Sequence, residues 1–307
     1  PPASAPAPPP PPAPAPAARA AARVFRRGEL RVIGCWTGGP EALAAGRRAA
    51  TAHSGARRAA ALDLPMKIER ITLSHYRWER PRPITNGLHT YSGVRLCGVR
   101  IDTDQGITGH GVGGAKAGER EHREHFARQL IGADPRLTEA VWARLWSPKQ
   151  FGRRGFETRA LGSLDLALWD IKGRLARMPV HQLLGGFRTR IPTYVAGGYY
   201  AEGKGLPELQ AEMASYVERG ARAVKMKVGA VPIADDVQRV QAVRRAIGPE
   251  VKLMVDANCA YRAYQAIQLA RRIEDQDIFW FEEAVQPDDY EGFTRLAGAT
   301  SIPLATG

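Results

Sequence analysis

The sequence has few cysteines and no long hydrophobic run. Cys35, Cys97 and Cys259 are too few and too far apart for a disulfide framework or a closed zinc site, so we expect reduced thiols in a cytoplasmic protein. No run of about 18 apolar residues is present to cross a bilayer, which argues against a membrane protein. Apolar residues make up 44% of the 307 residues and charged residues 24%, which is typical of a globular protein. This length suits about two domains.

Residues 1–65 contain no lysine and only three acidic residues, although the whole chain carries a formal charge of +13. They hold 12 prolines, 20 alanines and nine arginines, a composition that favours an extended chain with nothing large to bury. The arginines lack interleaved aromatic residues, and the start lacks the apolar core of a secretory signal, so nucleic-acid binding and targeting are poorly supported. We expect a disordered segment without function. Because Met66 is the first methionine of the sequence, we expect residues 1–65 to be upstream sequence translated in frame.

Residues 66–190 are expected to form a small α+β domain. Alternation of apolar and polar residues over 67–78 and 94–111 predicts antiparallel strands, and the Pro, Asn and Gly content between them predicts a loop. Helical spacing follows. A stripe of apolar residues recurs every three or four positions, at Leu161, Leu164, Leu168, Ile171 and Leu175.

Residues 191–307 repeat one pattern of short strands and amphipathic helices. The predicted strands are 192–198, 223–229, 252–258, 279–285 and 303–307. Each interval contains a helical pattern, so the strands are expected to be parallel and joined by right-handed crossovers.

This repeat suits either a βα barrel or an open doubly wound sheet. The stretch after the first strand, "AGGYYAEGKG", lacks the glycine spacing of a dinucleotide-binding fingerprint. The fold class we predict is therefore α/β: an α+β capping domain followed by a TIM-type (β/α) barrel of which about five of eight strands are present.

Lys225 and Lys227 lie two residues apart near the end of one predicted strand, so their side chains project to the same side. Two ammonium groups held close disfavour each other's charge, which lowers a pKa and would let one of them act as a neutral base. The alternative is a surface lysine pair, which an otherwise apolar strand makes less favourable.

Asp256 and Glu282 lie toward the ends of the next two predicted strands, within otherwise apolar runs. Two buried carboxylates without a partner are unfavourable, so a cation is expected beside them. Oxygen ligands favour Mg²⁺ or Mn²⁺ over zinc. The alternative is that Lys225 and Lys227 neutralise these acids as buried ion pairs.

Four ordered motifs, "SLDLALWDIKGRLARMPVHQLLGG", "VKMKVG", "MVDAN" and "FWFEEAV", make residues 66–307 resemble the mandelate racemase and muconate lactonizing branch of the enolase superfamily. The resemblance implies that Lys227 is a general base and Lys225 its electrostatic partner. It also implies that Asp256 and Glu282 bind Mg²⁺, and that Asn258 lies near the substrate carboxylate.

The resemblance implies removal of the proton α to a carboxylate, followed by dehydration of an acid sugar. Racemisation or epimerisation of a 2-hydroxy acid is the nearest alternative, and a non-enzymatic, truncated gene product is another. The partner is expected to be a small-molecule carboxylate, with no nucleic acid or membrane, and the full-length protein is expected to be a homo-oligomer.

Two departures from the family pattern concern the metal site and the barrel. Ala284 stands where the family usually has proline after its Glu-Glu pair. The third Mg²⁺ ligand, a glutamate, is expected directly after Gly307, together with three more βα units and a second acid or base. We therefore expect the 307-residue chain alone to lack turnover and tight Mg²⁺ binding.

Overall fold

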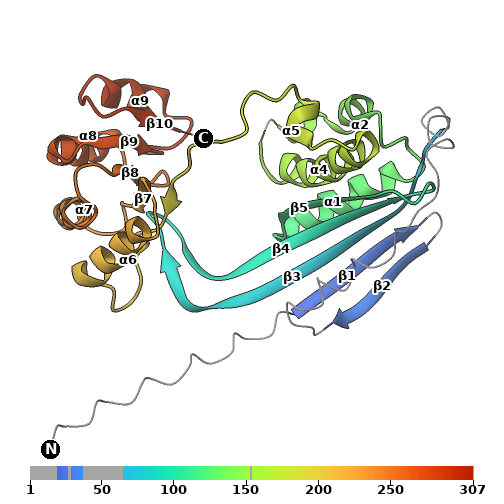
Figure 1. Ribbon diagram of the computed structural model, residues 1–307, viewed down its shortest axis with the longest axis horizontal. Helices are drawn as coiled ribbons and strands as arrows, with labels where there is room; N and C mark the ends of the chain where they lie inside the picture. The colour runs from blue at the N-terminus through green and yellow to red at the C-terminus, as the bar shows by residue number, and fades with distance from the viewer. Residues whose placement is uncertain (1–18, 27–28, 37–64, 153, 307) are drawn as a thin grey trace, which may run out of the picture. The chain divides into compact units, whose positions relative to one another are not determined.

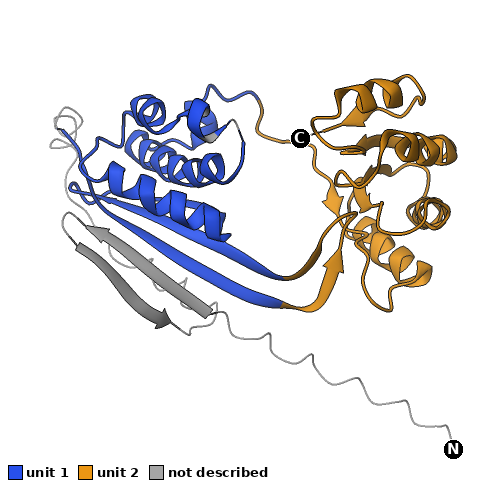
Figure 2. Ribbon diagram, turned by 180° about the vertical axis from the view of Figure 1, so that it is seen from behind, with its two compact units in different colours: residues 1–79, 93–187 blue, residues 80–92, 188–307 orange. Residues whose placement is uncertain are grey.

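The computed structural model describes residues 19–26, 29–36, 65–152 and 154–306, the first two ranges as backbone only. The chain divides into two compact units (Figures 1 and 2). Unit 1 comprises residues 1–79 and 93–187, and unit 2 comprises 80–92 and 188–307. The division after Phe187 lies near the boundary expected at residue 190. Residues 80–92, which the sequence analysis placed in the first domain, group with the second unit instead.

Unit 1 combines an antiparallel sheet with helices. Its sheet has the strand order β2-β1-β3-β4-β5. The strands are β1 (Arg19–Arg26), β2 (Glu29–Trp36), β3 (Ile68–Thr85), β4 (Thr90–Thr103) and β5 (Thr108–Gly114). The helices are α1 (Ala117–Leu130), α2 (Thr138–Leu145), α3 (Pro148–Phe151), α4 (Phe156–Ala176) and α5 (Val180–Leu183).

Helix α4 packs its predicted apolar stripe against this sheet. Leu161, Leu164, Leu168 and Ile171 are buried in one cluster with the side chains of β3, β4 and α1, which confirms the helical spacing. Gly111 on β5 permits the close approach of the helix, since a Cβ there would lie 2.2 Å from the Ser163 carbonyl oxygen.

Two strands lie within the segment that was expected to be disordered. Strand β1 pairs antiparallel with β2 and, over its whole length, with β3, from Arg19 opposite Arg77 to Arg26 opposite Arg70. The prediction of disorder does not describe these strands, because it averaged the composition of 65 residues. It overlooked two runs with β-branched and aromatic residues, "RAAARVFR" and "ELRVIGCW". Residues 1–18, 27–28 and 37–64 lie outside the described residues.

Unit 2 is a five-stranded parallel sheet with the order β10-β9-β8-β7-β6, which confirms the predicted alternation. Its strands are β6 (Val195–Ala196), β7 (Ala223–Lys227), β8 (Lys252–Asp256), β9 (Ile278–Glu282) and β10 (Leu304–Ala305). Its helices are α6 (Leu206–Glu218), α7 (Ile233–Ile247), α8 (Ala263–Ile273), a 3-10 turn (Glu274–Gln276) and α9 (Tyr290–Ala297). Met226, Val255 and Phe281 from the strands share one buried cluster with apolar residues of the helices. None of the helices in the described part of the chain is both long and apolar enough to span a bilayer.

The loop between β3 and β4 belongs to unit 2 and packs closely on its strand ends. Thr85 forms an antiparallel bridge with Tyr200. Asn86 closes the turn, since its Oδ1 accepts hydrogen bonds from the backbone nitrogens of Leu88 and His89. A Cβ at Gly87 would lie 2.2 Å from the Ala257 carbonyl oxygen. Only a residue without a side chain allows this contact.

We expect Gly87→Ala to destabilise this packing by about 1–3 kcal/mol, the usual effect of forcing extra atoms into a packed site. Gly162→Ala in α4 is the matched control, because a Cβ there would meet no atom within 4 Å. The control should gain up to about 1 kcal/mol from higher helix propensity. Urea denaturation measures both variants. Equal stability of the two would show that the loop does not depend on Gly87.

Candidate active site

The candidate active site lies at the C-terminal ends of β7, β8 and β9, the end where βα folds gather catalytic residues. The strand register places Lys227 opposite Asp256, and Asp256 opposite Glu282. Adjacent strands lie about 4.8 Å apart, so this register brings the three side chains into one row. Lys225 points to the same side as Lys227, while Met226 between them is buried in the core against the helices. The sequence analysis predicted this grouping.

The lysines contact the acids directly. Lys227 Nζ donates a hydrogen bond to Asp256 Oδ2 at 2.5 Å. Lys225 Nζ lies 2.7 Å from Glu282 Oε1 and 3.3 Å from Asp256 Oδ2. Asp256 is 1% exposed and each lysine 6%. The lysines and acids therefore form the buried ion pairs that the sequence left open as an alternative. The two lysines are not a solvated surface pair.

Lys225 does not have the lowered pKa that a pair of like charges predicts. Burial lowers the pKa of Lys225, but hydrogen bonds to Glu282 and Tyr194 and the charge of Asp256 outweigh it, so that the pKa is raised. The two carboxylates that the strand register brings close reverse the lowering expected from the neighbouring ammonium. In this arrangement the Lys225 ammonium is held between the two acids.

Asn258 follows Asp256 in a left-handed backbone conformation, with φ of 48°. Its backbone nitrogen donates to Asp256 Oδ1 at 2.9 Å, and its Nδ2 donates to Glu283 Oε2 at 3.1 Å. Its Oδ1 is buried and has no hydrogen-bond partner. The backbone of Asn258 thus helps to fix the Asp256 carboxylate, and its side chain is fixed by Glu283.

Asp256 and Glu282 fit a divalent cation. One cationic group, the Lys225 ammonium, already contacts an oxygen of each carboxylate. Carboxylate oxygens are the ligands that Mg²⁺ prefers. Glu282 is also oriented by Trp280, whose Nε1 donates to Oε2 at 3.0 Å. Within the described ranges no three His, Cys, Asp or Glu side chains cluster to hold a metal. Asp256 and Glu282 therefore offer two carboxylates at this position.

The sequence analysis missed two tyrosines that face the lysines. Lys225 Nζ lies 5.1 Å from the ring centre of Tyr194, and Lys227 Nζ lies 5.2 Å from that of Tyr199. An aromatic ring at this distance attracts a cation through its negative face. The sequence did contain a signal for these two tyrosines, because the motif "YVAGGYY" surrounds the C-terminal end of the first predicted barrel strand.

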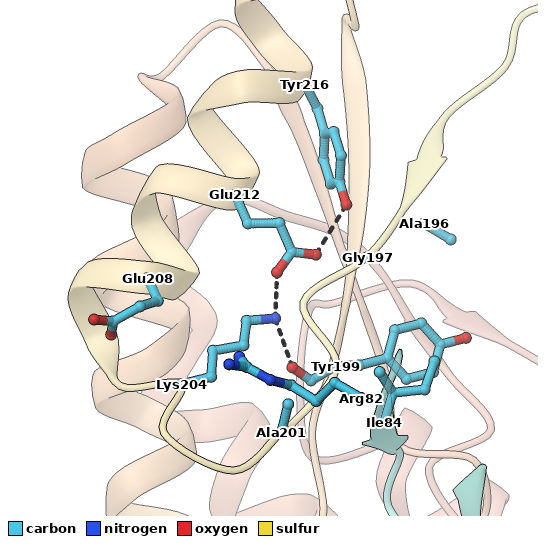
Figure 3. Close-up of a pocket in the computed structure, with 10 residues that line it drawn as sticks. All are labelled: Arg82, Ile84, Ala196, Gly197, Tyr199, Ala201, Lys204, Glu208, Glu212 and Tyr216. Atoms are coloured by element: carbon cyan, nitrogen blue, oxygen red, sulfur yellow. Dashed lines mark hydrogen bonds and ion pairs between the residues drawn. The ribbon is translucent and has the colours of Figure 1, made fainter. Parts of the chain in front are cut away.

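A cavity of about 430 Å³ lies beside the site in unit 2 (Figure 3). Tyr199 lines it and is the residue that connects it to Lys227. Lys204 forms an ion pair with Glu212 and donates to the Tyr199 carbonyl oxygen at 2.7 Å. Burial raises the pKa of Glu212, but hydrogen bonds from Lys204 and the Gly198 backbone outweigh it and lower the pKa overall. This ionised carboxylate holds the loop that carries Tyr199.

Comparison with known families assigns the chain to a class. The family model for the mandelate racemase / muconate lactonizing enzyme N-terminal domain matches residues 68–185, and the model for the enolase C-terminal domain-like family matches residues 208–307. The chain therefore belongs to the mandelate racemase and muconate lactonizing branch of the enolase superfamily, as its motifs implied.

Particular relatives are enzymes of acid sugars. The chain is 35% identical over 217 residues to an arabinonate dehydratase of Saccharolobus solfataricus, covering 69% of this chain and 58% of that protein. It is 36% identical over 250 residues to a 3,6-anhydro-alpha-L-galactonate cycloisomerase of Streptomyces coelicolor, covering 78% and 68%. The chain thus spans about three fifths to two thirds of the length of these relatives.

A solved relative resembles the fold closely. The L-talarate/galactarate dehydratase of Salmonella typhimurium superposes with a TM-score of 0.73 at 30% identity, covering 85% of this chain and 69% of that one. A mutant of L-talarate/galactarate dehydratase has been crystallised with Mg and L-glucarate.

Proposed function

We propose that the enzyme containing residues 66–307 removes the proton α to the carboxylate of an acid sugar in a Mg²⁺-dependent reaction and then eliminates water. The observation that carries this proposal is the row formed by Lys227, Asp256 and Glu282 at the ends of three adjacent strands. The dehydratases and the cycloisomerase among the relatives support acid sugars as the substrate class.

Asp256 and Glu282 would hold the Mg²⁺ ion, which would stabilise the negative charge that develops on the substrate carboxylate. The backbone nitrogen of Asn258 keeps Asp256 in place, and Asn258 would lie near the substrate carboxylate. The ammonium of Lys225, held between the two acids, adds a fixed positive charge to this side of the site. The site is thus built to stabilise an anion.

Lys227 acts as the base in the proposed reaction. Its neutral amine takes the α-proton and becomes an ammonium, while the electron pair of the C–H bond moves into the carboxylate as an enediolate. The electrons then return to form a double bond between the α- and β-carbons, and the C–O bond of the β-hydroxyl breaks. The hydroxyl leaves as water after it receives a proton from an acid.

Racemisation would share the first half of this reaction and differ in the second. A second base opposite Lys227 would return a proton to the other face of the α-carbon. Dehydration instead needs an acid beside the leaving hydroxyl. The dehydratases among the relatives support dehydration as the proposed outcome.

For the 307-residue chain alone we propose weak Mg²⁺ binding and no turnover. Among the described residues we propose two carboxylate ligands, Asp256 and Glu282, and the described parallel sheet has β6 and β10 as its unpaired edges. A barrel needs its strands closed into a ring to assemble residues from all sides.

A screen of acid sugars tests the proposal. It uses the full-length enzyme, which contains residues 66–307 and extends to the length of the related enzymes. We expect at least one aldonate or aldarate to lose one water in the presence of MgCl₂ and to remain unchanged in EDTA, as seen by mass spectrometry and NMR. Formation of an epimer without loss of water would replace dehydration by racemisation. No reaction with any acid sugar would contradict the proposed substrate class.

A further inference from the structure

A buried polar network lies behind the candidate active site and outside the proposed chemistry. It consists of two residues of α7, Asp236 and Arg239, and two tyrosines from loops, Tyr200 after β6 and Tyr261 after β8. Asp236 is 0% exposed and Arg239 is 7% exposed. Charged side chains are rarely buried this deeply unless they are paired.

The Asp236 carboxylate binds three loops at once. It accepts hydrogen bonds from the Tyr200 hydroxyl at 2.5 Å, the Gly229 backbone nitrogen at 2.8 Å and the Tyr261 hydroxyl at 2.9 Å. The three donors follow β6, β7 and β8 respectively. One side chain therefore ties together the C-terminal ends of three neighbouring strands, two of which carry Lys227 and Asp256.

Arg239 continues the network to the backbone of the proposed base. Its Nη2 donates to the Gly198 carbonyl oxygen at 2.9 Å and to the Lys227 carbonyl oxygen at 3.4 Å. Its guanidinium carbon lies 3.9 Å from the ring centre of Tyr200, and its Nε lies 3.5 Å from Asp236 Oδ1. The guanidinium thus connects the end of β7 to the loop that carries Tyr199 and Tyr200.

The hydroxyl groups of the network remain donors. Burial and the nearby charge of Asp236 raise the pKa of both Tyr200 and Tyr261, so both phenols stay protonated. A buried ion pair seldom adds net stability over apolar packing of the same volume. The network instead fixes the geometry of its members, because a carboxylate that accepts from three donors has one preferred position.

Tyr200 also connects the network to the loop between β3 and β4. Its backbone nitrogen donates to the Thr85 carbonyl oxygen at 3.0 Å, and its carbonyl oxygen accepts from the Thr85 nitrogen at 2.8 Å. The loop beside the site and the strand end carrying Lys227 are therefore held by the same tyrosine.

We propose that Asp236, Arg239, Tyr200 and Tyr261 form a positioning network that sets the place of Lys227 relative to Asp256 and Glu282. This inference rests on the proposed function, because the position of Lys227 matters only if its amine accepts the α-proton. None of the four side chains takes part in the proton transfer. They act on the base through its backbone and through the loops on either side.

Single removal of a hydroxyl tests the network in the full-length enzyme. Tyr200→Phe and Tyr261→Phe each remove one donor to Asp236 and keep the ring, and Tyr200→Phe keeps the backbone bridge to Thr85. Tyr264→Phe is the matched control, since Tyr264 is 61% exposed on α8. Misplacement of a catalytic group by about 1 Å can cost about 100-fold in rate. We expect each network variant to lower kcat by about tenfold or more, with KM, the Mg²⁺ dissociation constant and the control unchanged.

The melting temperature and kcat together separate positioning from simple stabilisation. A lower melting temperature with normal kcat, measured well below the transition, would show that the network only stabilises the fold and would overturn the inference. Wild-type enzyme that removes no α-proton would instead overturn the proposed function, and the inference with it. Active wild-type enzyme with fully active network variants would overturn the inference alone.

Discussion

Replacing Lys227 with alanine in the full-length enzyme is expected to abolish measurable dehydration. Loss of a general base typically lowers the rate by about 10²–10⁴-fold, and no other lysine lies at the end of β8 or β9 to replace it. Lys225 is a poor substitute, because its ammonium is already bound between Asp256 and Glu282, and these contacts raise its pKa. The measurement is kcat with the best acid sugar found in the screen.

Two controls make this prediction specific. Lys252→Ala removes an exposed lysine at the opposite end of β8 and should leave kcat unchanged. Mg²⁺ binding by the Lys227→Ala protein, measured by calorimetry, should persist, because the two carboxylates remain on their own strands. Substantial turnover by Lys227→Ala would transfer the role of base to another residue.

The Asp256→Asn variant is expected to lose Mg²⁺ binding and, with it, activity. Mg²⁺ binds a neutral amide oxygen much less well than a carboxylate. Changing a residue that only supports a metal ligand typically lowers metal affinity about 10–100-fold. Loss of a ligand itself should lower Mg²⁺ affinity at least this much. Calorimetric titration of the full-length enzyme with MgCl₂ measures the change.

Asp256→Asn also removes a buried charge that both lysines contact, so the variant could be unstable. Glu282→Gln is the milder test, since the Glu282 side chain is 23% exposed and contacts only Lys225 among the lysines. Asp275→Asn, an exposed change in the 3-10 turn before β9, is the control and should bind Mg²⁺ normally. Normal Mg²⁺ affinity in Glu282→Gln and Asp256→Asn would rule out these acids as the metal ligands.

The βα pattern of unit 2 could be predicted from sequence because each element carries its own local signal. Strand β7 reads "AVKMK", with Met226 buried on one side and two lysines on the other, and this alternation alone identifies the face. Helices α6 to α9 each lie in an interval between two predicted strands, where a helical pattern was expected. The positions of Asp256 and Glu282 could be predicted in the same way, because parallel strands bring their C-terminal ends to the same edge of the sheet.

Features that depend on several loops at once could not be predicted. Tyr200 and Tyr261 lie 36 and 25 residues from Asp236, and nothing in their local sequence distinguishes them from ordinary core or surface tyrosines. The raised pKa of Lys225 likewise depends on the register between β7, β8 and β9, which brings two carboxylates to one ammonium. Sequence spacing locates residues on strands and helices, whereas these contacts require the coordinates of three segments together.

Exchange of the substrate α-proton with solvent deuterium tests the central claim most directly. The full-length enzyme is incubated in D₂O with MgCl₂ and an acid sugar, and the α-carbon is followed by NMR. We predict that deuterium enters the α-position, or that the substrate is dehydrated, only when Mg²⁺ is present, and that Lys227→Ala shows neither process. Deuterium incorporation by Lys227→Ala at the wild-type rate, or by the wild-type enzyme in EDTA, would contradict the account.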